Sequence, residues 1–256
     1  MAHPLAGGGL IPVVRFDSSS SRFKDIMENF FEFFFNFDGK YSDAILAADA
    51  AGILPAELAA LKGRIQPPQY HPEGDAFVHT LLVVDRANEL NGSIFHIWGA
   101  LVHDLGKAVT PNDNLPHHFN HETLGVPLVK QLGDRLEICD AITAFGQLCA
   151  AEHLNVHKFL ELRPVKKVDF LTRVHEFGVA HDDFEDPKCK EYPIIINLAI
   201  VAQADAQGRG PTFIDRPYPQ RVATLEAWKI IRDIHDENPE NQRRLRAKAI
   251  AGKFGK

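Results

Sequence analysis

Residues 94–107 read IFHIWGALVHDLGK, an apolar run that closes on a histidine, an aspartate and a glycine. Apolar side chains recur in this run at helical spacing, namely Ile94, Ile97, Trp98, Leu101, Val102 and Leu105. The periodicity predicts a buried helix. We expect the helix to end at Gly106, because glycine is common just past a helix C-terminus. His103 and Asp104 are therefore predicted to lie on its last turn.

Further histidines and carboxylates stand on both sides of this run. His79 lies one turn from apolar neighbours, and Asp205 falls in helical register with Leu198 and Val201. A charge that projects from an apolar face is costly unless it has a partner. Imidazole and carboxylate ligands together suit divalent Mn, Fe, Co, Ni or Zn, and with added water also Mg. Taken singly, each residue also has a simpler explanation, such as a hydrogen-bonded core histidine or a pair between Asp205 and Arg209.

The remaining sequence predicts helices joined by short loops. Sustained alternation of polar and apolar residues, which would indicate a sheet, does not occur, and no repeat of fixed period appears. The predicted fold class is all-α. Beyond the central run, we expect helices over residues 75–90, 122–132, 135–153, 165–177, 192–206 and 221–236.

Several stretches share a more specific pattern than the His103-Asp104 dipeptide. They are residues 71–80, residues 100–107, Pro116 through His121-Glu122 with residues 125–129, Glu152-His153-Leu154 with His157, residues 161–164, Ala204-Asp205-Ala206 with Gly208-Arg209, and residues 215–219. From about Ala44 to about Gln220, the chain resembles the HD superfamily of metal-dependent phosphohydrolases. Within it, the similarity is to the HD domain of bacterial tRNA nucleotidyltransferases, the CCA-adding enzymes.

The resemblance implies an HD-domain helical bundle with a metal site at its centre, and it implies roles for individual residues. His79, His103, Asp104 and Asp205 match the four metal ligands of HD proteins. His121 and His153 match histidines that hold a second metal or contact phosphate. Asp104 and Lys107 are the catalytic candidates, and substrate contacts are expected from His118, His157, Arg163 and Arg209. The cofactor is one or two divalent ions per chain, drawn from Mg, Mn, Co, Ni or Fe.

The activity implied by the resemblance is hydrolysis of phosphomonoesters or cyclic phosphodiesters of nucleotides. Phosphatase, 2'-nucleotidase and 2',3'-cyclic phosphodiesterase reactions all belong to this class. One alternative is a di-iron HD oxygenase, and another is a non-catalytic binding module that the metal only stabilises. The relatives also carry a nucleotidyltransferase head with a Gly-Ser motif and paired aspartates. We find neither motif here, so polymerisation of CCA is not expected.

Four segments are expected along the chain. Residues 1–21 form a flexible N-terminal arm, residues 22–43 a Phe-rich helical extension, residues 44–220 the HD domain, and residues 221–256 a C-terminal helix with a basic tail. Six phenylalanines crowd into residues 30–37, too many for one buried face of a short helix. A homodimer contact is therefore one hypothesis for this segment, and ordinary packing over the core is the other.

The composition of the chain indicates which kinds of partner and which cellular compartment to expect. With 28 basic and 34 acidic residues the net charge is −6, which argues against non-specific nucleic-acid binding and favours a small phosphoester or nucleotide substrate. An RNA end is the less favoured partner. We expect no membrane segment, because no apolar run is long enough. Cys139, Cys149 and Cys189 form an odd, scattered set and no signal peptide is recognised, so a cytoplasmic location is expected.

Overall fold

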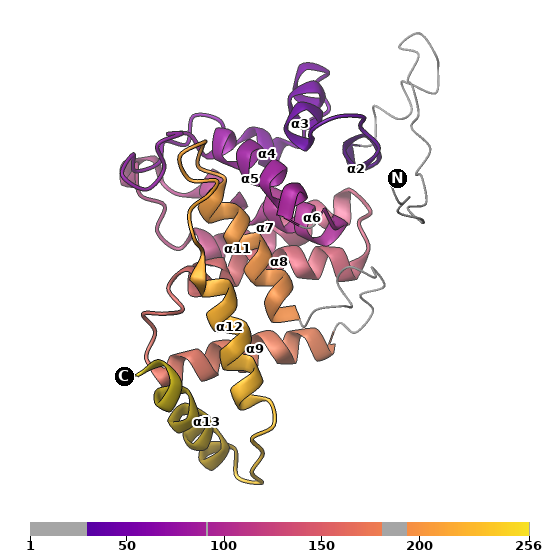
Figure 1. Ribbon diagram of the computed structural model, residues 1–256. Coiled ribbons are helices and arrows are strands. Elements are labelled where there is room, and N and C mark those ends of the chain that lie inside the picture. The colour runs from indigo at the N-terminus through magenta and orange to yellow at the C-terminus, as the bar shows by residue number, and fades with distance from the viewer. Residues whose placement is uncertain (1–29, 91, 181–193, 256) are drawn as a thin grey trace, which may run out of the picture. The chain divides into compact units, whose positions relative to one another are not determined.

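The computed structural model describes residues 30–90, 92–180 and 194–255, and within these ranges it is built from helices (Figure 1). The described ranges contain no β-strand, only an isolated antiparallel bridge between Ile65 and Asp75. The predicted all-α class is confirmed. The helices are α2 Phe30–Phe35, α3 Tyr41–Ala50, α4 Ala56–Ala59, α5 Ala76–Leu90, α6 Ile94–Val102, α7 His121–Arg135, α8 Asp140–His157, α9 Pro164–Ala180, α11 Ile194–Gln207, α12 Pro219–Ile231 and α13 Pro239–Phe254, with short 3-10 helices η1 Leu105–Val109 and η2 Asn112–Asn114.

Contacts within the chain divide it into two units, one up to Leu54 and one from Pro55 onward. In the first unit, α2 and α3 pack against each other through aromatic rings. The ring of Phe34 stacks on Phe30 at 5.5 Å between centroids and lies 5.0 Å from Tyr41. The predicted flexible arm and residues 22–29 of the Phe-rich extension lie outside the described residues. The homodimer contact stays a prediction.

Helix α6 is the central element of the second unit. The hydroxyl oxygen of Ser93 accepts a hydrogen bond from the Phe95 N–H and so caps the helix N-terminus. Every residue from Phe95 to Val102 is buried. A helix that is apolar on all sides must be covered on all sides, and α5, α8 and α11 provide that cover. The core of the bundle therefore surrounds the run that ends in His103-Asp104.

The end of α6 differs from the prediction. The α-helix stops at Val102, His103 takes the C-cap position, and Gly106 lies inside the 3-10 helix η1. Gly106 therefore does not end the helix. Its backbone presses directly on the start of α7, and a Cβ atom added to it would fall 1.9 Å from the His121 carbonyl oxygen. The glycine serves close packing, which a propensity argument cannot distinguish from helix termination.

The other predicted helices are present with shifted ends. α8 begins at Asp140, later than predicted, because Glu137 adopts a left-handed backbone conformation with φ of 53° that interrupts the helix. α12 ends at Ile231 rather than at residue 236. The predicted C-terminal helix and basic tail correspond to α12 and a separate helix α13, which packs against both α9 and α12.

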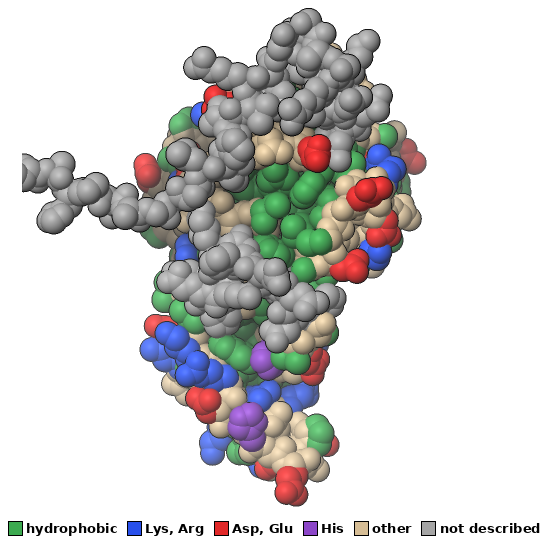
Figure 2. All heavy atoms as spheres, turned by 90° about the vertical axis from the view of Figure 1, so that its right-hand side faces the viewer, with side chains coloured by type: hydrophobic (Ala, Val, Ile, Leu, Met, Phe, Trp, Pro, Cys, Tyr) green, Lys and Arg blue, Asp and Glu red, His purple; other side chains and the backbone are tan. Residues whose placement is uncertain are grey.

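The described surface carries charges of both signs. On the face shown in Figure 2, basic and acidic side chains both occur, with hydrophobic side chains between them. No helix in the described part of the chain combines the length and apolar character needed to cross a lipid bilayer.

Candidate metal centre

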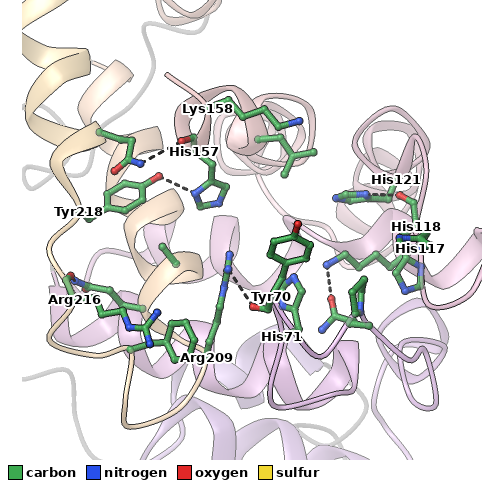
Figure 3. A pocket seen from close by; sticks show the side chains of 18 of the residues that line it. Tyr70, His71, His117, His118, His121, His157, Lys158, Arg209, Arg216 and Tyr218 are labelled. Carbon is green, nitrogen blue, oxygen red and sulfur yellow. Dashed lines mark hydrogen bonds between the residues drawn. The ribbon is translucent and has the colours of Figure 1, made fainter. Parts of the chain in front are cut away.

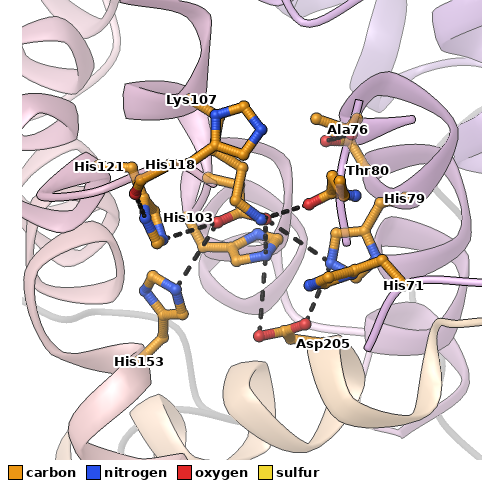
Figure 4. Close-up of polar contacts among 12 residues, drawn as sticks. His71, Ala76, His79, Thr80, His103, Lys107, His118, His121, His153 and Asp205 are labelled. Carbon is orange, nitrogen blue, oxygen red and sulfur yellow. Dashed lines mark hydrogen bonds and ion pairs between the residues drawn. The ribbon is translucent and has the colours of Figure 1, made fainter. Parts of the chain in front are cut away.

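Residues that are far apart in the sequence converge at the centre of the second unit (Figure 4). Each comes from a different position on the bundle: His79 from α5, His103 and Asp104 from the end of α6, His121 from the first residue of α7, His153 from α8 and Asp205 from α11. All of them are buried. The structure thus brings together the four predicted ligands and both predicted second-site histidines.

The first group consists of His79, His103 and Asp205. The His79 Nε2 atom lies 3.0 Å from one oxygen of Asp205, and the His103 Nε2 atom lies 4.0 Å from the other. One ligand atom from each of the three residues falls within 4.8 Å of the other two. These distances suit three side chains around a single cation.

The second group consists of Asp104, His121 and His153. Asp104 Oδ1 lies 3.3 Å from His121 Nε2 and 3.7 Å from His153 Nε2. Its other oxygen, Oδ2, faces the first group, 3.2 Å from His103 Nε2 and 3.7 Å from His79 Nε2. Asp104 therefore stands between the two groups and presents one oxygen to each.

Backbone hydrogen bonds orient the imidazole rings toward this space. The Nδ1 atoms of His103, His121 and His153 donate to the carbonyl oxygens of Ala100, His118 and Cys149. A ring with its proton on Nδ1 offers the lone pair of Nε2, which is the form that metal-binding histidines take. The outer hydrogen bonds thus prepare three rings as ligands.

Several buried polar atoms of the centre lack a hydrogen bond. They include His103 Nε2, Asp104 Oδ1 and His121 Nε2. A buried polar group left in this state costs about 1–3 kcal/mol. His103 Nε2 belongs to the first group, and Asp104 Oδ1 and His121 Nε2 belong to the second, so a divalent cation in each group would satisfy these atoms. The residues present therefore fit the metal that the sequence predicts.

The ionisation states of the two carboxylates and of His153 suit metal ligands. Burial by itself raises the pKa of Asp104, but the positive charges of His103 and Lys107 outweigh it and hold that pKa well below the usual value. For Asp205, burial is likewise outweighed by His157 and Arg209, and its pKa is lowered. Burial and the neighbouring His103 lower the pKa of His153, so its ring is neutral. Burial by itself lowers the pKa of His103, but Asp104 and Asp205 outweigh it and raise that pKa, so the His103 ring must release a proton to bind a cation. Anionic carboxylates and neutral imidazoles are the forms that bind cations.

Charged side chains balance the two carboxylates. The Lys107 ammonium group lies 2.5 Å from Asp104 Oδ2, and Arg209 lies 3.3 Å from Asp205 Oδ1. The simpler explanation for Asp205, a pair with Arg209, is thus realised alongside the imidazole cluster. His157 Nε2 is 2.5 Å from Asp205 Oδ2, and its Nδ1 is hydrogen-bonded to the Tyr218 hydroxyl.

Sequence reasoning assigned no role to Glu73 or Gln66, which also lie in this region. Glu73 Oε1 lies 2.7 Å from His79 Nδ1 and 2.8 Å from His71 Nδ1, and these contacts lower the pKa of Glu73 to about 2 despite its partial burial. Buried Gln66 accepts a hydrogen bond from Lys107 at 2.5 Å. Glu73 lies within residues 71–80, one of the stretches that carry the family resemblance, and this was the only feature of the sequence that pointed to it. No feature of the sequence pointed to Gln66.

A pocket of about 790 Å³ opens onto the centre (Figure 3). Lys107, His121 and His71 line it on the side of the metal ligands, and the predicted substrate residues His118, His157 and Arg209 line it as well. Burial and the charges of Lys107 and Arg64 lower the pKa of His118 to about 4, so its ring is neutral at pH 7. Arg163 is not brought to this pocket. It is exposed and lines a separate cavity with Pro164, Val165 and Lys166.

Comparisons with known proteins concern the same part of the chain. Residues 76–206 match the HD domain family. The chain is 36% identical over 192 residues to the Multifunctional CCA protein of Actinobacillus pleuropneumoniae serotype 5b, covering 73% of this chain and 43% of the relative. It is also 36% identical to the proteins of the same name from Pasteurella multocida, over 71% of this chain and 41% of the relative, and from Methylococcus capsulatus, over 76% and 43%. The chain thus spans less than half the length of these relatives. Since the family match covers both groups of the centre and more than half of the sequence, the chain belongs to the HD domain family.

Proposed function

We propose that the chain is a metal-dependent phosphohydrolase that acts on phosphomonoesters or cyclic phosphodiesters of nucleotides. The reactions would be of the phosphatase, 2'-nucleotidase or 2',3'-cyclic phosphodiesterase type. The proposal depends chiefly on one observation: two adjoining groups of buried ligands that share Asp104 lie beside a pocket lined with cationic side chains.

His79, His103 and Asp205 would hold one divalent ion, and Asp104, His121 and His153 would complete the centre toward a second. When bound, such an ion polarises a phosphoryl oxygen and lowers the pKa of water enough to supply hydroxide at neutral pH. Mg, Mn, Co, Ni and Fe all accept nitrogen and oxygen ligands of this kind. The identity and number of bound ions are to be measured by metal analysis.

The chain's own residues would bind and orient the anionic substrate. Lys107 lies between Gln66 and Asp104 and lines the pocket, so its ammonium group can pair with a phosphoryl oxygen. Arg209 lines the same pocket, and its Nη1 and Nη2 groups each make one hydrogen bond, to the Tyr70 carbonyl oxygen and to Asp205. A guanidinium group with a spare donor suits phosphate.

Two roles are open to Asp104. It could accept a proton from the attacking water, or it could act as a ligand of the cation. A carboxylate whose pKa lies well below the usual value is a weak base. Because each of its oxygens faces a different imidazole pair, we assign Asp104 mainly to the ligand role and Lys107 to charge stabilisation.

The test is metal-dependent turnover by substituted proteins. Asp104→Asn and Asp104→Ala should reduce the release of phosphate from nucleotide monoesters, or the opening of 2',3'-cyclic nucleotides, by at least about 100-fold. Metal content should fall, while helical circular dichroism is retained. Asp113→Asn, which changes an exposed carboxylate on η2, is the matched control and should behave as wild type. Undiminished turnover by Asp104→Asn would refute the proposal.

The six-residue arrangement also suits a di-iron oxygenase. The cationic lining contributed by Lys107, Arg209 and Arg216 favours a phosphoester over a neutral small molecule. Metal analysis decides between the two, because a coloured, oxygen-sensitive state with two irons would favour the oxygenase. A protein that turns over no phosphoester, and only melts earlier without metal, would instead be a binding module. An RNA end remains the less favoured substrate, since the net charge is −6.

A further inference from the structure

Two exposed aromatic side chains line the same pocket of the second unit. The exposed large hydrophobic side chains among the described residues include two aromatic ones, Tyr70 at 61% and Phe119 at 62% relative exposure. Both line the pocket that opens onto the metal centre. Exposed aromatic rings that line a pocket are suited to stacking against a flat group of a ligand.

Phe119 is part of a stacked pair. Its ring lies 5.6 Å from the ring of His117, with an angle of 20° between the planes. Both residues are exposed, and both line the pocket. The pair therefore presents an aromatic platform that can carry a further flat ring.

The platform is held in place next to the metal ligands. His118, between the two stacked residues, is hydrogen-bonded through Nδ1 to the Thr110 hydroxyl at 2.6 Å and through Nε2 to the Ile65 carbonyl at 3.1 Å. His121, a member of the second ligand group, begins α7 two residues after Phe119. A ring bound on this platform would therefore be close to the centre at little cost in ordering the protein.

The backbone at Tyr70 is anchored by Arg209. The Arg209 guanidinium group donates to the Tyr70 carbonyl oxygen at 3.2 Å, and the same side chain contacts Asp205. In Figure 3, Tyr70 and His71 stand between Arg209 and the segment that carries His117 and His118. Aromatic rings thus adjoin the cations Lys107 and Arg209, which is the combination that a phosphate with an attached planar base requires.

We propose that Tyr70 and the stacked pair His117–Phe119 form a subsite that holds the base of the nucleotide. The inference rests on the proposed phosphohydrolase function and adds the residues that select the substrate. Because every base has a flat aromatic face, stacking here would distinguish nucleotides from sugar phosphates more strongly than it distinguishes one base from another. The pocket, at about 790 Å³, is within the usual range for sites that enclose molecules of this size.

The test compares two substrates that differ only in the base. Turnover of adenosine 2'-monophosphate and of ribose 2-phosphate is measured with the metal-loaded full chain and with Phe119→Ala, Tyr70→Ala and the double variant. For the nucleotide, each single change should raise KM about 10-fold with little effect on kcat. For ribose phosphate, KM should stay within about two-fold. Phe119→Trp should restore nucleotide binding. Val222→Ala, which removes an equally exposed side chain outside the pocket, is the control.

Calorimetric binding of adenosine 2'-monophosphate to the same proteins provides a readout that needs no turnover. Weaker binding to Phe119→Ala than to wild type would support the subsite even if no phosphoester is hydrolysed, in which case the proposed function alone fails. Equal affinity of wild type and the double variant would overturn the subsite. An equal rise in KM for both substrates would also overturn it, because the aromatic side chains would then serve the shape of the pocket and not the base.

Discussion

Replacement of Gly106 by alanine tests how the two ligand groups are held together. A Cβ atom at this position would lie 1.9 Å from the His121 carbonyl oxygen and 2.6 Å from the Gly125 backbone nitrogen. Ordinary van der Waals contacts of a Cβ atom are 3.4–4 Å, and both neighbours are backbone atoms that no side-chain rotation can move. The 3-10 helix η1 must therefore separate from α7.

Overpacking of this kind costs about 1–3 kcal/mol and occasionally more, and a clash with two backbone atoms of α7 falls at the upper end. We expect Gly106→Ala to lower the free energy of unfolding by about 3 kcal/mol or more. For a domain of this size the unfolding midpoint should fall by roughly 6–12 °C. Metal affinity should fall as well, because the displacement occurs between Asp104 and His121.

The assay is thermal and urea unfolding followed by circular dichroism, with and without added metal. Gly125→Ala provides a graded comparison, since its nearest contacts would be 3.2 Å from the Gly106 nitrogen and 3.3 Å from Ala150, and its effect should be smaller. Gly252→Ala meets nothing within 4 Å inside α13 and should be neutral or stabilising by up to about 1 kcal/mol. If Gly106→Ala unfolds within about 0.5 kcal/mol of wild type, the packing argument is refuted.

Four further outcomes are expected. Removal of metal with a chelator should lower the unfolding midpoint by about 10 °C if the ion is present at about 1,000 times its Kd, and an unchanged midpoint would show that no ion binds the folded centre. Glu73→Gln should weaken metal binding 10- to 100-fold by releasing the His79 ring, as measured by competition titration against a coloured chelator, whereas unchanged affinity would separate Glu73 from the centre. Arg64→Ala should raise KM for phosphoesters, because Arg64 holds the carbonyl oxygens of Lys107 and Thr110, and Arg232→Ala on the surface should have no such effect. The hydrogen bond from Arg243 lowers the pKa of Asp169, so the ion pair contributes to stability above pH 3.8 and this contribution is lost as the pH falls below that value. The difference in free energy of unfolding between wild type and Arg243→Ala should therefore decrease to zero as the pH is lowered through this range.

Most of the helices of the fold could be predicted from the helical periodicity of apolar residues. The apolar run before His103 predicted a buried helix, and α6 is buried on all sides. Periodicity could not locate the helix end, because Gly106 is required by a contact with α7 that is distant in the sequence. Glu137 shows the same limit of sequence reasoning. Nothing in the neighbouring sequence predicts a left-handed backbone at this glutamate, and α8 begins after it.

The chemical type of each site residue decided whether its role could be predicted from the sequence. Histidines and aspartates on apolar helix faces can be recognised in the sequence, because a buried charged or polar group needs a partner. The four predicted ligands and the two histidines predicted for a second metal or phosphate lie together. Gln66 is different: an amide is tolerated almost anywhere in a sequence, and only its position against Lys107 shows that it matters. Arg163 shows the converse, since a charged residue in a family-like motif lies away from the pocket.

The position of Asp104 explains why one dipeptide is so informative. His103 caps the C-terminus of α6, and Asp104 precedes the 3-10 helix η1. The two oxygens of Asp104 therefore lie near different imidazole pairs. One carboxylate contacts both groups, so neither group can move without changing the other. A histidine followed by an aspartate specifies the residue types, but the sharing of Asp104 is produced by the close approach of η1 and α7 at Gly106. The chemistry of the centre therefore depends on a backbone contact as much as on its ligands.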